Sequence, residues 1–251
     1  MIKLISKNWE IDNIQAVLFD KDGTFIDLHF FWGKITEMRA EKTCEKFQLP
    51  ISYLNKLCSF LGYDTESKKM LSNGITALYS RNKIIEIYNQ CLIDMDLKSS
   101  EAIIETIFDE VNIEFYKNIN DYILPINEAI ELIKKLHAKG IKLGIVTADS
   151  VESTKITLKN NNWENLFQVI IGRESCCEPK ESGIPAQIAL ESLGISSKNA
   201  VMIGDTPTDY LSAQKAGIKN TILVASGQIN SEELKKTTPF VLESLKDLIC
   251  I

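Results

Sequence analysis

The segment Val17-Leu18-Phe19-Asp20-Lys21-Asp22-Gly23-Thr24 limits the possible folds of this chain more than any other. An apolar run, typical of a buried strand, leads directly into an acid; a second acid follows two positions later, and Gly23 then permits a turn. Open α/β sheets bind their ligands where strands end, so Asp20 and Asp22 are expected to face one pocket. Two unit charges about 4 Å apart repel by ~4 kcal/mol at an effective dielectric near 20, a cost that a bound cation would offset. Asp and Gly are also ordinary turn residues, so the segment alone leaves a plain polar junction open.

The second half of the chain alternates between short apolar runs and amphipathic stretches. After the strand Ala16–Asp20, further strands are predicted at 142–147, 168–172, 200–204 and 220–224. Helices are predicted at 127–139, 150–161, 185–193, 207–216 and 239–249. This alternation is typical of an α/β fold, a doubly wound parallel sheet with helices on both faces.

A long helical stretch interrupts the alternation after the first strand. Helical periodicity without a convincing strand pattern predicts helices at 34–47, 51–61, 75–93 and 99–118. We therefore expect a Rossmann-like core of residues 1–25 and 123–251 and an inserted all-helical domain of residues 26–122. Residues 1–15 are expected to form an extended lead-in and loop, and the aromatic segment 25–33 a loop.

Composition excludes several classes of protein. The chain has 28 basic and 34 acidic residues and a net charge of -6, which argues against a nucleic-acid or anionic-membrane partner. No apolar run approaches the roughly 20 residues of a membrane helix. The N-terminus is too polar for a secretory signal, which favours a cytoplasmic location. The six cysteines lack CxxC spacing, so we expect free structural thiols.

Four of the five predicted strands end in residues that carry chemistry. Besides Asp20 and Asp22, Thr147 and Ala148 end the second strand, Lys180 follows the third, and Gly204-Asp205-Thr206-Pro207-Thr208-Asp209 ends the fourth. Parallel strands bring these ends to one edge of the sheet. Acidic oxygen ligands suit Mg²⁺, whereas a lysine, a hydroxyl and exposed N–H groups suit a phosphate.

These motifs, in this order and spacing, resemble the four motifs of the haloacid-dehalogenase-like hydrolase superfamily over residues 16–251. The chain is most similar to phosphoglycolate-phosphatase-like members, which carry a helical cap of the C1 type at this position. The resemblance implies a Mg²⁺-dependent phosphatase that acts on a small phosphorylated metabolite.

The resemblance also implies roles for two acids in the reaction. Asp20 is expected to be the nucleophile, which attacks phosphorus to form an aspartyl-phosphate. Asp22 is expected to be the general acid for the leaving oxygen and then the base for the attacking water.

Binding roles follow from the same resemblance. The Asp20 carboxylate, the Asp22 backbone carbonyl and Asp205 are expected to hold Mg²⁺, with Asp209 supporting the site through water. The residues expected to bind the phosphoryl oxygens are Thr147 and Lys180, with backbone N–H groups near Gly23 and Ala148.

Several of these residues have a simpler alternative role. Asp209 also completes a capping-box pattern with Thr206, and both roles can hold. Asp149 and Ser150 are interpreted as helix caps. Lys180 departs from the family pattern because Glu181, rather than proline, follows it. His29 is a candidate substrate contact.

Most other functions on the same scaffold would need different residues. A dehalogenase would not need Asp22 or the metal, and a phosphonate hydrolase would need a cap lysine that nothing in the sequence marks. A phosphosugar mutase shares every core residue and stays open as the alternative enzyme. A non-catalytic phosphate-binding or regulatory protein is the rival from another class, but such proteins usually lack a core acid, and none is missing here.

Overall fold

The computed structural model describes residues 1–251. Its contacts divide the chain into two compact units. The core unit comprises Met1–Asp27 and Pro125–Ile251, and the inserted unit comprises Leu28–Leu124.

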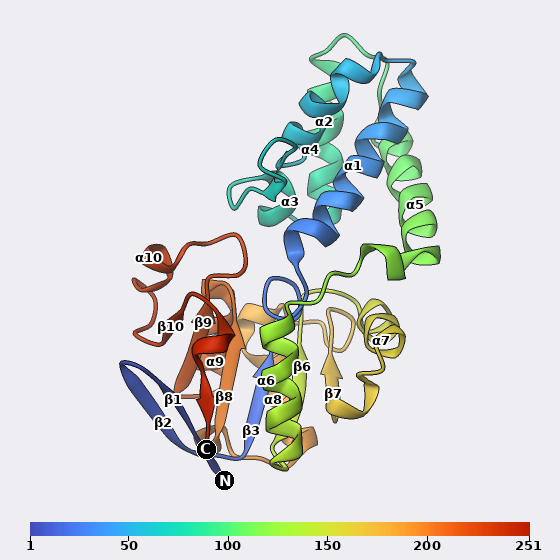
Figure 1. Cartoon of the computed structure of the whole chain (residues 1–251). Helices are drawn as coiled ribbons and strands as arrows, with labels where there is room; N and C mark the ends of the chain where they lie inside the picture. Colours follow the sequence, from blue (N-terminus) through green and yellow to red (C-terminus); the bar gives the residue numbers. More distant parts are fainter. The chain divides into compact units, whose positions relative to one another are not determined.

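A six-stranded parallel sheet forms the centre of the core unit, in the order β10-β9-β8-β3-β6-β7 (Figure 1). Its strands are β3 (Ala16–Phe19), β6 (Lys142–Val146), β7 (Val169–Ile171), β8 (Ala200–Gly204), β9 (Asn220–Val224) and β10 (Val241–Leu242). The chain continues from β3 to β6 and β7 on one side and then crosses to β8 on the other. The carboxyl end of β3 is therefore the switch point at which such sheets bind ligands.

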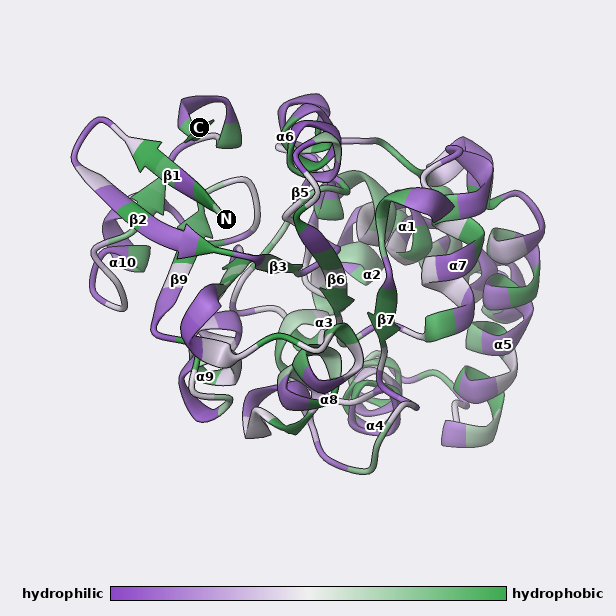
Figure 2. Cartoon of the chain, turned by 90° about the horizontal axis from the view of Figure 1, so that it is seen from below, coloured by the Kyte–Doolittle hydropathy of each residue, from purple (hydrophilic) through white to green (hydrophobic).

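Helices cover both faces of this sheet, as the strand–helix alternation predicts. The helices of the core unit are α6 (Asn127–Ala138), α7 (Val151–Asn160), α8 (Ile184–Leu193), α9 (Pro207–Lys215) and the short α10 (Ser231–Leu234) beside the edge strand β10. Apolar residues of α8 and α9 form one core cluster with the sheet, among them Leu190 and Ala213 with Leu18 of β3. Figure 2 shows β3 and β7 in the hydrophobic colour, while α6 carries both colours, as expected for a helix with one buried face. The predicted α/β fold class is confirmed.

Both ends of the chain form a second sheet, which the sequence interpretation missed. In it β1 (Ile2–Ser6) pairs with β2 (Trp9–Ile14) and with β11 (Ile249–Cys250), all antiparallel. Residues 1–15 are extended, as expected, but they pair as strands and do not form a loop, and the expectation of a helix over 239–249 was wrong. Pairing between segments far apart in the sequence, including β10 with β9, overrides the helical periodicity of the C-terminal segment.

The inserted unit is a helical bundle. Its helices are α1 (Leu28–Phe47), α2 (Leu54–Phe60), α3 (Ile75–Leu78), α4 (Arg81–Ile93) and α5 (Glu101–Lys117). A short hairpin, β4 (Tyr63–Asp64) and β5 (Lys69–Met70), joins α2 to α3. The expected helix 75–93 is interrupted because Tyr79 and Ser80 are extended. The aromatic segment expected as a loop is largely the first turns of α1.

Two further sequence expectations concern cysteines and membranes. All six cysteines are free, with Cys44 and Cys58 buried and Cys177 exposed. No helix combines the length and the apolar character that crossing a bilayer requires.

Candidate active site

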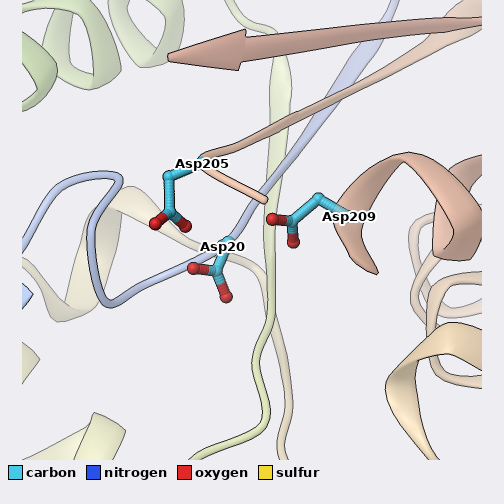
Figure 3. Close-up of side chains that lie close together, drawn as sticks. All are labelled: Asp20, Asp205 and Asp209. Carbon is cyan, nitrogen blue, oxygen red and sulfur yellow. The ribbon is translucent and has the colours of Figure 1, made fainter. Parts of the chain in front are cut away.

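Three buried carboxylates meet at the carboxyl end of the parallel sheet (Figure 3). One oxygen from each of Asp20, Asp205 and Asp209 lies within 4.8 Å of the other two. Their exposed fractions are only 7%, 3% and 1%. Side chains from distant parts of the sequence therefore share one space away from bulk water.

The neighbouring strands β3 and β8 place two of these acids. The Asp20 N–H donates to the Ile203 carbonyl at 2.8 Å, which extends the parallel pairing to the last residue before the turn. Asp205 directly follows β8. Asp209 lies in the first turn of α9, where its Oδ2 accepts hydrogen bonds from the backbone N–H of Thr206 at 3.0 Å and from its hydroxyl at 2.8 Å. The predicted capping box is confirmed.

Two glycines make room for the Asp205 carboxylate. A Cβ atom on Gly23, whose φ is +85°, or on Gly227 would overlap this carboxylate. The loop that contains Gly227 also holds the turn after β3, because the Ser226 hydroxyl donates to the Gly23 carbonyl at 2.6 Å. The sequence interpretation missed Ser226 and Gly227, although they follow a predicted strand at the same edge of the sheet.

Lys180 supplies a positive charge among these acids. Its Nζ lies 2.5 Å from Asp20 Oδ1 and 2.6 Å from Asp209 Oδ1, and the side chain is 8% exposed. Burial alone would lower the pKa of Lys180, but the carboxylates of Asp20 and Asp209 raise it above its ordinary value. The lysine is therefore charged, and it lies beside Asp20 even though Glu181 rather than proline follows it.

Two of the buried acids have raised pKa values. Burial, together with repulsion from Asp209 and Asp22, raises the pKa of Asp20 to about 7 despite the ion pair with Lys180. Burial and the charges of Asp20 and Asp209 raise the pKa of Asp205 well above its ordinary value. The protein alone therefore resists ionising all of these acids together, and additional positive charge would stabilise them.

Lys21, which lies between the two acids of the first motif, belongs to a second ion-pair group. Its Nζ is 2.9 Å from Asp22 Oδ1 and 2.7 Å from Asp149 Oδ2, and Lys21 is fully buried. The Lys21 charge lowers the pKa of Asp149, although burial opposes this shift. Of the two expected caps, Ser150 is the N-cap of α7 and accepts from the Ser153 N–H at 3.0 Å. Asp149 does not accept from an N–H of α7; the first of these, on Val151, donates to Glu174 Oε1 at 2.8 Å.

The expected phosphate-binding residues lie at the same edge of the sheet. Thr147 is 4% exposed, and its Oγ1 accepts from the Asp149 N–H at 3.1 Å, which leaves the hydroxyl proton to donate elsewhere. Ala148 is exposed at the end of β6. The Gly23 N–H donates to the Ile26 carbonyl at 2.7 Å, so Gly23 makes room for Asp205 and does not offer this donor to a phosphate.

His29 lies in the inserted unit, where its Nδ1 accepts from the Met70 N–H at 3.1 Å. This bond fixes one of its two ring nitrogens to the β4–β5 hairpin. A role for His29 in binding substrate stays a prediction.

The residues present fit a divalent cation with hard oxygen ligands. Carboxylates at these strand ends outnumber the ammonium groups, with Asp20, Asp22, Asp149, Asp205 and Asp209 against Lys21 and Lys180. Glycines on two sides keep the space beside Asp205 open. Mg²⁺ prefers such oxygen ligands and commonly binds through one or two carboxylates, with waters and substrate oxygens completing its shell.

The chain matches known proteins at the level of family and sequence. The family model described as haloacid dehalogenase-like hydrolase matches residues 17–224. The pyrophosphatase PpaX of Bacillus pumilus is 33% identical over 179 residues, which is 69% of this chain and 80% of that protein. A phosphoglycolate phosphatase of Aquifex aeolicus is 26% identical over 239 residues, or 94% and 95% of the two chains.

The fold is shared with solved structures. A haloacid dehalogenase-superfamily hydrolase of subfamily IA from Geobacter sulfurreducens superposes with a TM-score of 0.65 at 18% identity, over 97% of each chain. At this identity the likeness concerns the fold alone.

Proposed function

Because this chain belongs to the haloacid dehalogenase-like hydrolases, we propose that it is a Mg²⁺-dependent phosphatase that hydrolyses a small phosphorylated metabolite. The observation that carries the proposal is the buried group at the end of β3, where Asp20 touches Lys180 and faces Asp205 and Asp209. A carboxylate nucleophile beside an ammonium group and a set of acidic oxygens suits phosphoryl transfer.

In the first half of the proposed reaction, a carboxylate oxygen of Asp20 attacks phosphorus. The bond from phosphorus to the leaving oxygen breaks, Asp22 donates a proton to that oxygen, and Asp20 carries the phosphoryl group. The Thr147 hydroxyl, the Lys180 ammonium and the Ala148 N–H bind the phosphoryl oxygens and stabilise their charge.

In the second half, water hydrolyses the aspartyl-phosphate. Asp22, now ionised, accepts a proton from the water as its oxygen attacks phosphorus, and the bond between phosphorus and Asp20 breaks. Phosphate leaves, and both acids return to their starting protonation states.

The Asp20 carboxylate, the Asp22 backbone carbonyl and Asp205 would hold Mg²⁺, and Asp209 would support this site through water. The metal supplies positive charge that offsets repulsion between the carboxylates and the phosphate. Asp209 would also hold Lys180 and Thr206 in place, because one of its two oxygens contacts each of these residues.

The named relatives of this chain differ in the substrate that their names give. One is a pyrophosphatase and another a phosphoglycolate phosphatase, and both names are compatible with the residues that surround Asp20. We propose that the inserted helical domain, predicted at 26–122, is a cap that determines which phosphorylated metabolite is accepted. A phosphosugar mutase is the alternative, in which a second hydroxyl replaces water.

A substrate panel tests the proposal. Purified protein with Mg²⁺ is assayed for phosphate release from pyrophosphate, phosphoglycolate and several sugar phosphates, with Asp20→Asn as the control. Mg²⁺-dependent release that the Asp20→Asn variant loses supports a phosphatase. Isomerised sugar phosphate without free phosphate would instead support the mutase, and no turnover of any compound would contradict both.

A further inference from the structure

A buried lysine lies between the two acids of the first motif and pairs with the second of them. Lys21 is 0% exposed, and its Nζ contacts Asp22 Oδ1 at 2.9 Å and Asp149 Oδ2 at 2.7 Å. This group is separate from the one that Lys180 forms with Asp20 and Asp209. The proposed reaction so far uses neither Lys21 nor Asp149.

Asp149 connects Lys21 to the expected phosphate-binding strand end. Its backbone N–H donates to Thr147 Oγ1 at 3.1 Å, and its Oδ1 accepts from the Ser150 N–H at 2.7 Å. Its carbonyl accepts from the Arg173 N–H at 3.0 Å, which joins this turn to the segment after β7. Lys21 therefore joins the Asp22 side chain to the turn that orients the Thr147 hydroxyl.

The backbone around Lys21 is equally constrained. Its carbonyl accepts hydrogen bonds from the N–H groups of Phe25 and Ile26, both at 3.1 Å. Both the main chain and the ammonium group of this residue are thus fixed. The Asp22 side chain, by contrast, is 16% exposed and reaches the edge of the buried region.

Stability alone is a weak reason for such a group. Replacing a buried ion pair with apolar residues of similar volume is often neutral or stabilising, because desolvating the charges costs as much as their attraction returns. What a buried, hydrogen-bonded pair does supply is a defined position for its members. The position fixed here is that of Asp22, the residue for which proton transfer is proposed.

We propose that Lys21 is a positioning residue that, through Asp149, fixes the Asp22 carboxylate relative to the phosphate-binding turn at Thr147. The inference rests on the proposed function, since it concerns proton transfer in that reaction. Lys21 itself need not touch the substrate. Its loss should impair steps in which Asp22 transfers a proton and should spare phosphoryl binding and the attack by Asp20.

Leaving groups of different basicity separate these steps. An alkyl phosphate needs a proton on its leaving oxygen, whereas p-nitrophenolate leaves without one. The rapid first release of p-nitrophenolate reports attack by Asp20, and steady-state turnover of an alkyl phosphate includes the proton transfers by Asp22. Asp22→Asn provides the reference for complete loss of proton transfer.

The main variant is the double substitution Lys21→Met with Asp149→Leu. It removes one charge of each sign, so the net charge of the group is unchanged, and the Asp22 carboxylate, whose side chain is 16% exposed, loses the ammonium group that holds it. We expect kcat for the alkyl phosphate to fall about 10²-fold, a typical contribution of general acid–base catalysis, while KM and the p-nitrophenolate burst rate change by less than about threefold. Ser150→Ala, which removes the α7 cap from the same turn, should lower Tm and leave both rates unchanged.

Equal losses with both leaving groups, a defect confined to KM, or wild-type turnover of the alkyl phosphate would overturn the inference. If the double variant does not fold, Asp149→Asn replaces it, because Lys21 then keeps Asp22 as a partner and the amide oxygen can still accept from Ser150. For this variant we expect a smaller fall in kcat for the alkyl phosphate, again with little change in the p-nitrophenolate burst rate. An unchanged kcat for the alkyl phosphate would overturn the inference. Failure of the wild-type protein to release phosphate would instead contradict the proposed function.

Discussion

The ammonium group of Lys180 lies 2.5 Å from the carboxylate of Asp20, although 160 positions separate the two residues in the sequence. The same ammonium group contacts Asp209 at 2.6 Å. The segment after β7 thus supplies the positive charge that the carboxylates after β3 and β8 require. The catalytic and binding roles proposed for these residues all depend on the strand ends lying side by side.

Replacing Lys180 should abolish most activity. Lys180→Met leaves Asp20 and Asp209 buried without their ammonium partner and removes a donor for the phosphoryl group. We expect kcat/KM to fall by about 10²–10³, as for loss of a single oxyanion donor, together with a lower Tm. Steady-state kinetics and thermal unfolding measure the two effects. Lys198→Met, at an exposed position of the same unit, is the control and should change neither; activity near the wild-type value in Lys180→Met would refute the role.

A methyl group at Gly23 should displace the Asp205 carboxylate. Gly23 has φ +85°, and its Cβ would overlap Asp205, whereas Gly194 has φ +63° and open space around its Cβ position. Substitution by Ala should therefore cost both positions about 1–2 kcal/mol of backbone strain. Only Gly23→Ala should also weaken Mg²⁺ binding, by about tenfold or more, which is ~1.4 kcal/mol.

Titration with Mg²⁺, followed by activity and by the shift in Tm, distinguishes these two variants. Equal Mg²⁺ affinity in Gly23→Ala and Gly194→Ala would show that the space beside Asp205 does not matter for the metal.

Stabilisation by Mg²⁺ should depend on pH. The folded protein has a raised pKa at Asp20, about 7 against an ordinary value of 3.8, and at Asp205. Between these two values the folded state binds a proton at Asp20 that the unfolded chain has released, so Asp20 makes the metal-free protein less stable as pH rises through that window, and the raised pKa of Asp205 acts in the same direction. Binding of Mg²⁺ requires the ionised carboxylates, and its stabilising effect should therefore grow over the same window.

Thermal unfolding with Mg²⁺ and with EDTA measures this effect. At a Mg²⁺ concentration about 100 times Kd we expect Tm to rise by about 5–10 °C near pH 8 and by clearly less near pH 5. Asp205→Asn should lose most of the rise. A Mg²⁺ effect of the same size at both pH values would mean that these acids are not its ligands.

The sequence predicts the parts of this site that follow from local patterns. The apolar run before Asp20 specifies a buried strand, and the Thr206–Asp209 spacing specifies a helix start. The placement of Asp20 and Asp205 therefore follows from the strand ends, and that of Asp209 from the helix start. The parallel sheet follows from the alternation of elements.

Contacts between distant residues account for what the sequence could not show. The ion pair between Lys21 and Asp149 has no periodic signal, because a single lysine beside two acids is compatible with a solvated turn. The C-terminal segment has helical periodicity, yet pairing of Val241–Leu242 with β9 and of Ile249–Cys250 with β1 makes it extended. In both cases tertiary contacts, and not local preference, decide the structure.

Trapping the covalent intermediate tests the central claim, that Asp20 is the nucleophile, most directly. The protein is mixed with Mg²⁺ and a substrate from the panel, quenched during turnover and reduced with borohydride, which converts a phosphorylated aspartate to homoserine; peptide mapping by mass spectrometry then locates the change. We predict homoserine at position 20, only when substrate is present, and none in Asp20→Asn. Turnover with position 20 unmodified and another residue phosphorylated would contradict the account.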